Sequence, residues 1–239
     1  MATFVLVHGA GHGGWCYQRV APLLRDAGHD VYAPTLTGLG ERSHLLDGRV
    51  DLSQHIDDVV NVVRYEDLHD VILVGHSYGG PVVTGAADRL PDRVAKLVYL
   101  DASYVGQGES VADAFGGGLE ALRSAGRTVD GIELILLPTD DGGPFYGVED
   151  PGDRAWMAGR LTAFPWRCFE QPLHLADPDV VAAIPTFHVV CSAGASNADP
   201  TTMEEARREG RLWMLDTHHE AMISEPEVLA GVLLDIAAR

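Results

Sequence analysis

The sequence has 239 residues, 46% of them hydrophobic, and its 17 lysines and arginines against 35 acids give a formal charge of −18. This length and hydrophobic content suit one substantial core in a single α/β domain of roughly 200–250 residues. The negative charge would repel a polyanion from most of the surface, which argues against nucleic-acid binding, and no uncharged apolar run reaches membrane-spanning length.

The three cysteines, Cys16, Cys168 and Cys191, are far apart in the sequence and include no C-x-x-C pair. This spacing predicts neither a disulfide framework nor a zinc ribbon, and free thiols fit a reducing cytosol. The chain enters a predicted strand at once, without the basic and long apolar segments of a secretory signal. We therefore expect a cytoplasmic protein that contacts no membrane, and we expect no metal and no cofactor.

The first predicted strand, Thr3 to Val7, is followed by the glycine-rich segment HGAGHGGW at residues 8–15. Its glycines allow the loop to fold back closely over the end of the sheet. We interpret His8 and His12 as hydrogen-bonded scaffold residues of this loop.

Two helices and a strand follow. Apolar spacing predicts a helix over residues 15–27 that ends at Gly28, then a strand from Asp30 to Ala33. A second helix, over residues 52–67, places four apolar side chains on one face, namely Ile56, Val59, Val60 and Val63.

Residues 71–90 read VILVGHSYGGPVVTGAADRL, which predicts a buried strand, a sharp turn and a helix. In such a G-x-S-x-G turn the serine, Ser77, takes a strained backbone conformation. The flanking residues are glycines because a side chain at either position would collide with a neighbouring strand or helix. Pro81 is well tolerated in the first turn of the helix that follows. The serine hydroxyl should therefore stand above the carboxyl end of the sheet, beside the positive end of a helix.

The apolar run Val94 to Leu100 predicts a strand covered on both faces, and it delivers Asp101 at its carboxyl end. Open α/β sheets build their sites at this edge. The alternative role for Asp101 is that of a cap or turn residue, which is common for aspartate at strand ends.

The strand and helix alternation lapses between residues 105 and 185, which we interpret as a cap inserted into a core made of residues 1–104 and 186–239. Helix-like pieces are expected over residues 111–125 and 153–164, with an apolar patch at residues 132–137. The candidates for lining a substrate pocket there, of which several are expected to form the cap's own core instead, are Phe115, Leu136, Phe145, Tyr146, Trp156, Phe164 and Trp166.

The alternation then returns, with strands expected at residues 187–191 and 212–215 and a helix between them at residues 201–209. The last strand ends in DTHHEAM at residues 216–222, before a final helix over residues 225–238. A histidine on the loop after the last strand is the expected base for a serine nucleophile.

A serine hydroxyl is a poor nucleophile at neutral pH, so Ser77 requires a base within hydrogen-bond reach and an acid that orients this base. The order serine, acid, histidine along the chain is that of the α/β-hydrolases. An oxyanion hole is expected from two main-chain N–H groups, those of Ala10 and of Tyr78, the residue after the nucleophile.

The motifs HGAGHGGW, GHSYGG and HHEAM together resemble the small α/β-hydrolases related to plant methylesterases and hydroxynitrile lyases, including bacterial esterase relatives. The resemblance covers nearly the whole chain except the cap. It implies an α/β-hydrolase fold with a mostly parallel sheet of about six strands and helices on both faces. Aligning HHEAM with the family's catalytic histidine, usually followed closely by methionine, implies His219 as the base, with His218 as the alternative.

The acid departs from the family pattern. Most relatives carry it a few residues after the strand that corresponds to residues 187–191, where this sequence has no carboxylate at the expected position. Asp199 could serve only if its loop folds back. Some other α/β-hydrolases, including certain haloalkane dehalogenases, carry the acid after the strand that follows the nucleophile helix, which is the place of Asp101. We therefore predict Asp101, with Asp199 as the alternative.

These residues predict a serine esterase that cleaves a small carboxylic ester through an acyl-enzyme. A hydroxynitrile lyase is the nearest alternative, but the resembling lyases use a lysine after the catalytic histidine and a threonine near the first loop, where this chain has Glu220 and Gly9. A small-molecule receptor or a cofactor-free oxygenase on the same fold is the other alternative. The expected partner is an ester substrate, and the sequence leaves open whether the protein is a monomer or a homodimer.

Overall fold

The computed structural model describes residues 1–139, 146–193 and 197–239. Its main sheet has six parallel strands in the order β2-β1-β3-β4-β8-β9. The strands are β1 (Thr3–Val7), β2 (Asp30–Tyr32), β3 (Val71–His76), β4 (Val94–Leu100), β8 (Thr186–Cys191) and β9 (Leu212–Leu215). The expected mostly parallel sheet of about six strands is confirmed, and the carboxyl ends of β3, β4 and β9 meet at one edge.

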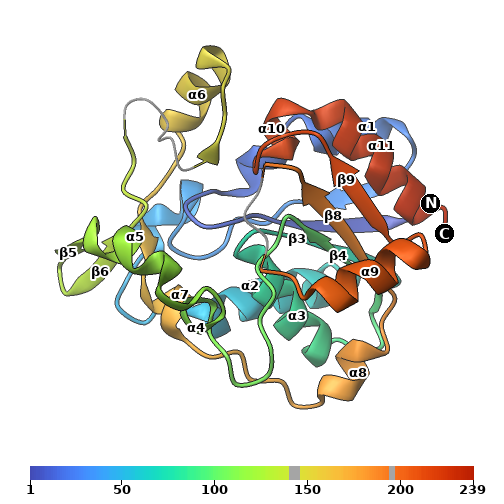
Figure 1. Ribbon diagram of the computed structural model, residues 1–239, viewed down its shortest axis with the longest axis horizontal. Coiled ribbons are helices and arrows are strands. Elements are labelled where there is room, and N and C mark those ends of the chain that lie inside the picture. Colours follow the sequence, from blue (N-terminus) through green and yellow to red (C-terminus); the bar gives the residue numbers. More distant parts are fainter. Residues whose placement is uncertain (140–145, 194–196) are drawn as a thin grey trace.

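Helices cover both faces of this sheet (Figure 1). One face carries α2 (Leu52–Tyr65), α3 (Gly79–Arg89) and α8 (Pro178–Ala182), and the other carries α1 (Val20–Asp26) and α11 (Pro226–Ala237). A separate apolar core lies on each face. The four apolar residues predicted on the inner face of α2 are all buried, as expected for an amphipathic helix against a sheet.

One predicted helix is divided in the structure, and the final helix has a short helix before it. The helix expected over residues 15–27 consists of a 3₁₀ turn, η1 (Gly14–Tyr17), followed by α1. The buried Tyr17 lies in this turn, and its hydroxyl donates to the carbonyl of Val7 at 3.1 Å. The final helix is preceded by a short helix, α10 (Ala221–Ser224). The break falls before Pro226, because proline has no N–H with which to continue the preceding turn.

The segment between β4 and β8 forms a second, three-stranded antiparallel sheet and several short helices. The helix expected over residues 111–125 is interrupted by three consecutive glycines, and the one expected over residues 153–164 ends early. The elements are α4 (Val111–Ala114), η3 (Gly116–Leu119), α5 (Glu120–Ser124), β5 (Arg127–Val129), β6 (Ile132–Ile135), α6 (Pro151–Ala158), β7 (Phe164–Pro165) and α7 (Arg167–Glu170). Figure 1 shows the β5–β6 hairpin and α6 standing away from the main sheet.

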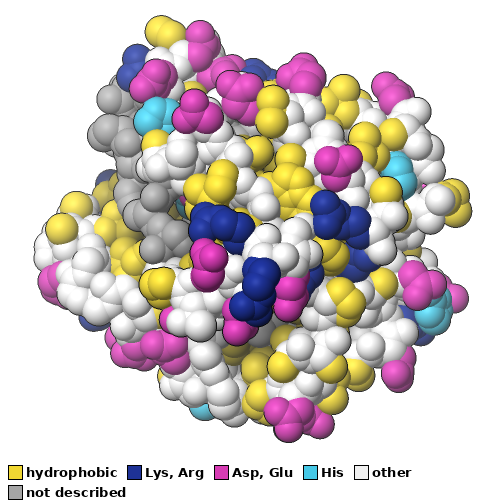
Figure 2. Space-filling model, turned by 45° about the vertical axis from the view of Figure 1, so that its right-hand side comes forward, with side chains coloured by type: hydrophobic (Ala, Val, Ile, Leu, Met, Phe, Trp, Pro, Cys, Tyr) yellow, Lys and Arg dark blue, Asp and Glu magenta, His cyan; other side chains and the backbone are white. Residues whose placement is uncertain are grey.

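Two further elements complete the described chain, η2 (Gly40–Leu45) and α9 (Pro200–Arg208). Figure 2 shows acidic side chains scattered over much of one face of the molecule, with lysines and arginines gathered near its middle, in keeping with the formal charge of −18. None of the helices in the described ranges is both long and apolar enough to cross a membrane.

Candidate active site

Ser77 lies in the sharp turn between β3 and α3, with a backbone φ of 53°. Few residues other than glycine adopt this left-handed conformation without strain. A Cβ on Gly75 would lie 2.5 Å from the carbonyl oxygen of Gly79, and one on Gly79 would lie 2.8 Å from that of Val7. The predicted crowding by helix and strand is therefore present, and it is this close packing that holds the serine in its turn.

The acid and the base meet beside this turn. The Nδ1–H of His219 donates to Oδ2 of Asp101 over 2.5 Å. Oδ1 of Asp101 accepts the main-chain N–H of Cys191 at 3.1 Å, so both oxygens of this buried carboxylate are engaged. Asp101 itself has a φ of 40°, which shows that the carboxyl end of β4 is bent to aim this side chain at the loop after β9.

The surroundings of His219 favour its charged form. Burial alone lowers the pKa of this imidazole, but its hydrogen bond to Asp101, followed by the charges of Glu220 and Asp101, outweighs burial and holds the pKa above its usual 6.5. A base that readily becomes an imidazolium suits the removal of a proton from a serine hydroxyl.

The two alternatives weighed from the sequence have other partners. His218 is partly exposed, and its Nε2 lies 3.1 Å from Oε1 of Glu149. Asp199 accepts the N–H of Thr202 at 2.8 Å and caps the start of α9. The structure thus brings Asp101, and not Asp199, to His219.

The glycine-rich loop after β1 presses against Ser77. A Cβ on Gly9 would lie only 2.8 Å from Cβ of Ser77, so this close approach requires glycine. Within the described residues, the main-chain N–H groups of Ala10 and Tyr78 donate to no protein acceptor. Two amides near the serine are therefore available to a ligand.

The two histidines of this loop are scaffold residues, as expected. His8 is buried between the carbonyl of Gly9, at 2.8 Å from its Nδ1, and the N–H of Leu36, which donates to its Nε2 at 3.0 Å. Burial lowers the pKa of His8 to about 3, so its ring is neutral. The Nδ1 of His12 lies 2.9 Å from the carbonyl of Ala10.

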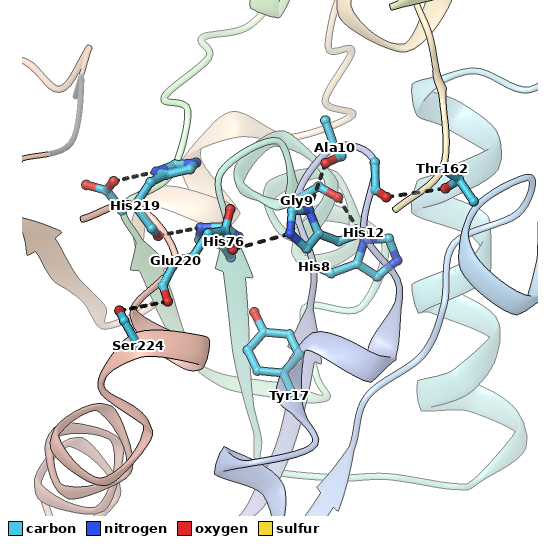
Figure 3. Close-up of polar contacts among 12 residues, drawn as sticks. His8, Gly9, Ala10, His12, Tyr17, His76, Thr162, His219, Glu220 and Ser224 are labelled. Carbon is cyan, nitrogen blue, oxygen red and sulfur yellow. Dashed lines mark hydrogen bonds and ion pairs between the residues drawn. The ribbon is translucent and has the colours of Figure 1, made fainter. Parts of the chain in front are cut away.

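Two further histidines that the sequence analysis did not single out support the site. Nδ1 of the buried His55 lies 2.9 Å from the hydroxyl of Tyr78, and its Nε2 lies 2.9 Å from the carbonyl of Thr37. His76 precedes the serine, and its Nε2–H donates to the carbonyl of His219 at 3.0 Å (Figure 3). One ring therefore fixes the residue after the serine and the other fixes the backbone of the base.

A cavity of about 430 Å³ opens in front of these residues. Ser77, Asp101 and His219 line it together, facing apolar side chains from the segment between β4 and β8. Of the pocket residues predicted from the sequence, Phe115 and Tyr146 line this cavity. The remaining lining side chains of this segment are those of Val111, Leu119 and Phe169, which the sequence analysis missed.

Four of the other candidates do not line this cavity, namely Leu136, Trp156, Phe164 and Trp166. Phe164 is fully buried, and its ring centroid lies 4.9 Å from that of Tyr78. The guanidinium of Arg123 lies 4.7 Å from the ring centroid of Trp166, and that of Arg19 lies 5.0 Å from the ring centroid of Trp156. Phe145 falls outside the described residues.

Across the described ranges, the one group with the spacing of metal ligands is His76, His219 and Glu220, whose donor atoms lie within 4.8 Å of one another. One nitrogen of each histidine is already engaged, by the carbonyl of His219 and by Asp101 respectively. Each ring has therefore one nitrogen left for a ligand.

Comparison with known proteins follows this geometry. The model of the alpha/beta hydrolase family matches residues 4–232 of the chain. The carbendazim hydrolyzing esterase of Nocardioides sp. (strain SG-4G) is 57% identical over 111 residues, which are 46% of this chain and 46% of that protein. Putative methylesterase 11 of Arabidopsis thaliana, described as chloroplastic, is 35% identical over 257 residues, covering 98% of this chain and 63% of that protein. The chain thus spans less than two thirds of the length of either relative.

Solved structures show the same architecture. The crystal structure of the methylesterase protein MES16 from Arabidopsis superposes with a TM-score of 0.77 at 27% identity, covering 100% of this chain and 99% of that one. A second solved structure superposes with a TM-score of 0.76 at 25% identity, covering 98% of each chain. It is an extracellular alpha/beta-hydrolase from a Paenibacillus species, described as sharing structural and functional homology with tobacco salicylic acid binding protein 2.

Proposed function

Because this chain belongs to the alpha/beta hydrolase family, we propose that it is a serine hydrolase that cleaves a small carboxylic ester. Ser77 is the nucleophile, His219 the base and Asp101 the acid that orients the base. The observation that carries this proposal is the 2.5 Å contact between His219 and the buried Asp101, beside a serine held at a φ of 53° in the same cavity. The names of the similar esterases and methylesterases support the same reaction class.

The reaction begins when the Ser77 hydroxyl attacks the ester carbonyl and passes its proton to Nε2 of His219. Asp101 stabilises the imidazolium that forms. The N–H groups of Ala10 and Tyr78 bind the developing oxyanion. His219 then gives its proton to the departing alcohol, and a water activated by His219 hydrolyses the acyl-enzyme and restores Ser77.

The segment at residues 105–185 acts as a cap over a core of residues 1–104 and 186–239, within a single domain. It supplies the apolar side of the cavity, including Phe115 and Phe169, while the core supplies Ser77 and His219. The substrate class is therefore a small ester with an apolar acid or alcohol part.

The mouth of the site favours uncharged substrates. A second groove of about 490 Å³ shares Gly147, Ala193 and His218 with the cavity. Its carboxylate side chains belong to Glu149, Asp150, Asp153, Asp216 and Glu225. An acidic rim repels esters that carry a second carboxylate and speeds the departure of the acid product.

A lyase that needs an ammonium group beside its base has no support in this site. The only lysine of the sequence, Lys96, lies near the start of β4, at the other end of the strand from Asp101. Its Nζ donates to the carbonyls of Ile236 and Ala237 at 2.8 and 3.3 Å. The residue after His219 is instead the acidic Glu220.

The test combines turnover and labelling. Purified protein is incubated with a panel of p-nitrophenyl and methyl esters that also includes carbendazim, and separately with a fluorophosphonate that is located by peptide mass spectrometry. We expect turnover of neutral esters and a label on Ser77, both lost in Ser77→Ala with unchanged circular dichroism. Tight binding of esters without turnover or label would reject hydrolysis and favour a receptor.

A further inference from the structure

A buried polar cluster lies next to His219, and the proposed mechanism does not use it. Its centre is the side chain of Glu220, which is 1% exposed. Within the described part of the chain, neither carboxylate oxygen of Glu220 has a hydrogen-bond donor, and the Nε2 of His12 lies 3.4 Å from Oε2. A carboxylate removed from water is costly unless another group compensates its charge. This charge therefore requires an explanation.

The backbone holds Glu220 in place on both sides. The carbonyl of His219 accepts the ring Nε2–H of His76. The carbonyl of Glu220 accepts the main-chain N–H groups of Ile223 and Ser224 at 2.9 and 3.0 Å. The hydroxyl of Ser224 donates to the same carbonyl of Glu220 at 3.1 Å. Figure 3 shows Glu220, His76 and His219 grouped together, with His12 facing them from the loop after β1. The carboxylate is thus fixed beside the base.

His12 compensates this carboxylate. Its Nδ1 faces the carbonyl of Ala10, which requires a proton on that nitrogen, and its Nε2 faces the carboxylate of Glu220. Both contacts are favourable when the ring is an imidazolium, or when Glu220 donates a proton to Nε2. This contact joins the loop of the expected oxyanion hole to the loop of the base.

We propose that Glu220 is a positioning residue for the base, a second buried carboxylate that acts with Asp101 to stabilise the imidazolium form of His219. This inference rests on the proposed function. The group that Glu220 acts on is the imidazole that receives the Ser77 proton. Glu220 acts through its charge, since its carboxylate lies within 4.8 Å of a nitrogen of that ring but forms no hydrogen bond with it.

The pKa shifts nearby agree with this role. Among the influences that raise the pKa of His219, its hydrogen bond to Asp101 is the largest and the charge of Glu220 is the next. Burial raises the pKa of each thiol and phenol that faces Glu220, and burial lowers that of His76, so these groups are neutral near pH 7. The facing thiols and phenols are those of Cys16, Tyr17, Tyr146 and Cys191. The groups that raise the pKa of the base are therefore the carboxylates of Asp101 and Glu220.

The first test is the pH profile of kcat/KM for a neutral p-nitrophenyl ester, compared between the wild type and Glu220→Gln. Removing a negative charge makes His219 a weaker base, so the acid limb of the profile moves to lower pH. The plateau falls by less than about tenfold, because the nucleophile, base and acid remain. Glu66→Gln is the matched control, since Glu66 caps the end of α2 just before β3, at the edge of the sheet opposite the site.

The rescue variant is Glu220→Asp, which keeps the charge and should keep the acid limb near its wild-type position. If Glu220→Gln fails to fold, Glu220→Met supplies a neutral side chain of similar size for the same comparison. A purely structural role would lower the plateau or the melting temperature and leave the limb in place. An unmoved limb in a folded neutral variant would overturn the proposal.

A second readout does not require turnover. The Cε1–H signal of His219, assigned by its loss in His219→Gln, is titrated by NMR in the wild type and in Glu220→Gln. We expect its titration to move to lower pH in the variant. If the wild type hydrolyses no ester, the proposed function fails, and this titration still decides the role of Glu220. If its midpoint is the same in both proteins, the role of Glu220 is rejected even when esters are hydrolysed.

Discussion

Asp101, the proposed triad acid, has an unusual backbone conformation. Its φ of 40° is rare for a residue other than glycine, yet both of its carboxylate oxygens are engaged, one by His219 and one by the N–H of Cys191. Strained residues of this kind persist where the surroundings hold them, and they are concentrated at active sites. The aspartate at the end of β4 is therefore more than a turn residue.

The role of Asp101 as the triad acid predicts a large loss of activity in Asp101→Asn. The amide cannot hold the imidazole in the correct tautomer, so kcat should fall by about 10⁴ while the substrate KM changes little. Steady-state kinetics with a p-nitrophenyl ester measure this loss. Asp199→Asn is the matched control, because Asp199 caps α9 and should affect only stability. Near-normal activity in Asp101→Asn would reject this assignment.

At the scale of elements, the turn between β3 and α3 depends on contacts that leave no room for a side chain. A Cβ on Gly75 would lie 2.5 Å from the carbonyl of Gly79 and 2.7 Å from Cγ2 of Val83. The first neighbour is backbone, so relief would require α3 to move away from β3. The nucleophile would move with it, because Ser77 lies between these two elements.

Gly75→Ala should therefore lower the free energy of unfolding by about 1–3 kcal/mol and also reduce labelling of Ser77 by a fluorophosphonate. The matched control is Gly231→Ala. Gly231 lies on the exposed side of α11, where an added Cβ meets nothing within 4 Å, so alanine should raise the free energy of unfolding by up to about 1 kcal/mol. Urea denaturation measures both. A Gly75→Ala protein as stable and reactive as the wild type would contradict this account of the turn.

The sequence predicts the elements best where their pattern is regular. All six strands of the main sheet and the turn at Ser77 follow from apolar runs and from residues at strand ends. The pairing of Asp101 with His219 was predicted with the help of the resemblance to other α/β-hydrolases. The cavity lining does not follow from such patterns, because the segment between β4 and β8 has no strong periodicity. An aromatic residue in this segment suits the protein interior and the cavity equally well. Phe164 is an example of the first and Phe115 of the second.

The supporting histidines were missed for a different reason. His55 lies on the otherwise apolar inner face of α2, and His76 occupies the x position before the serine in G-x-S-x-G. Neither the helix periodicity nor the turn motif indicates which residue the histidine contacts. The sequence position of Glu220 is more informative about its surroundings. Glu220 is a charged residue directly after the base and before the buried residues Ala221 to Ile223.

At the scale of the whole molecule, several buried histidines make stability depend on pH. Burial lowers the pKa of His8 to about 3 and that of His188 to about 4, both from 6.5. Below pH 6.5 the unfolded chain binds protons that the folded chain does not, so each group lowers stability as the pH falls toward its folded pKa. The pKa of His219 is raised, so its stabilising contribution is complete below pH 6.5 and is lost only as the pH rises.

We therefore expect the free energy of unfolding to fall by about 1.4 kcal/mol per pH unit for each of these two histidines between pH 6 and pH 4. Urea denaturation at a series of pH values measures the slope. His188→Asn should make the slope shallower, whereas His69→Gln, which replaces a histidine with a 57% exposed side chain, should leave it unchanged. A free energy of unfolding that stays constant over this range would contradict the prediction.

The position of Lys96 has a practical consequence. It is the only lysine in a chain of 239 residues, and it lies toward the edge of the sheet opposite the cavity. Burial lowers the pKa of its amine, which increases the fraction in the nucleophilic, uncharged form. Coupling to an amine-reactive resin through Lys96 would therefore hold the protein in one orientation, with the catalytic cavity directed away from the support.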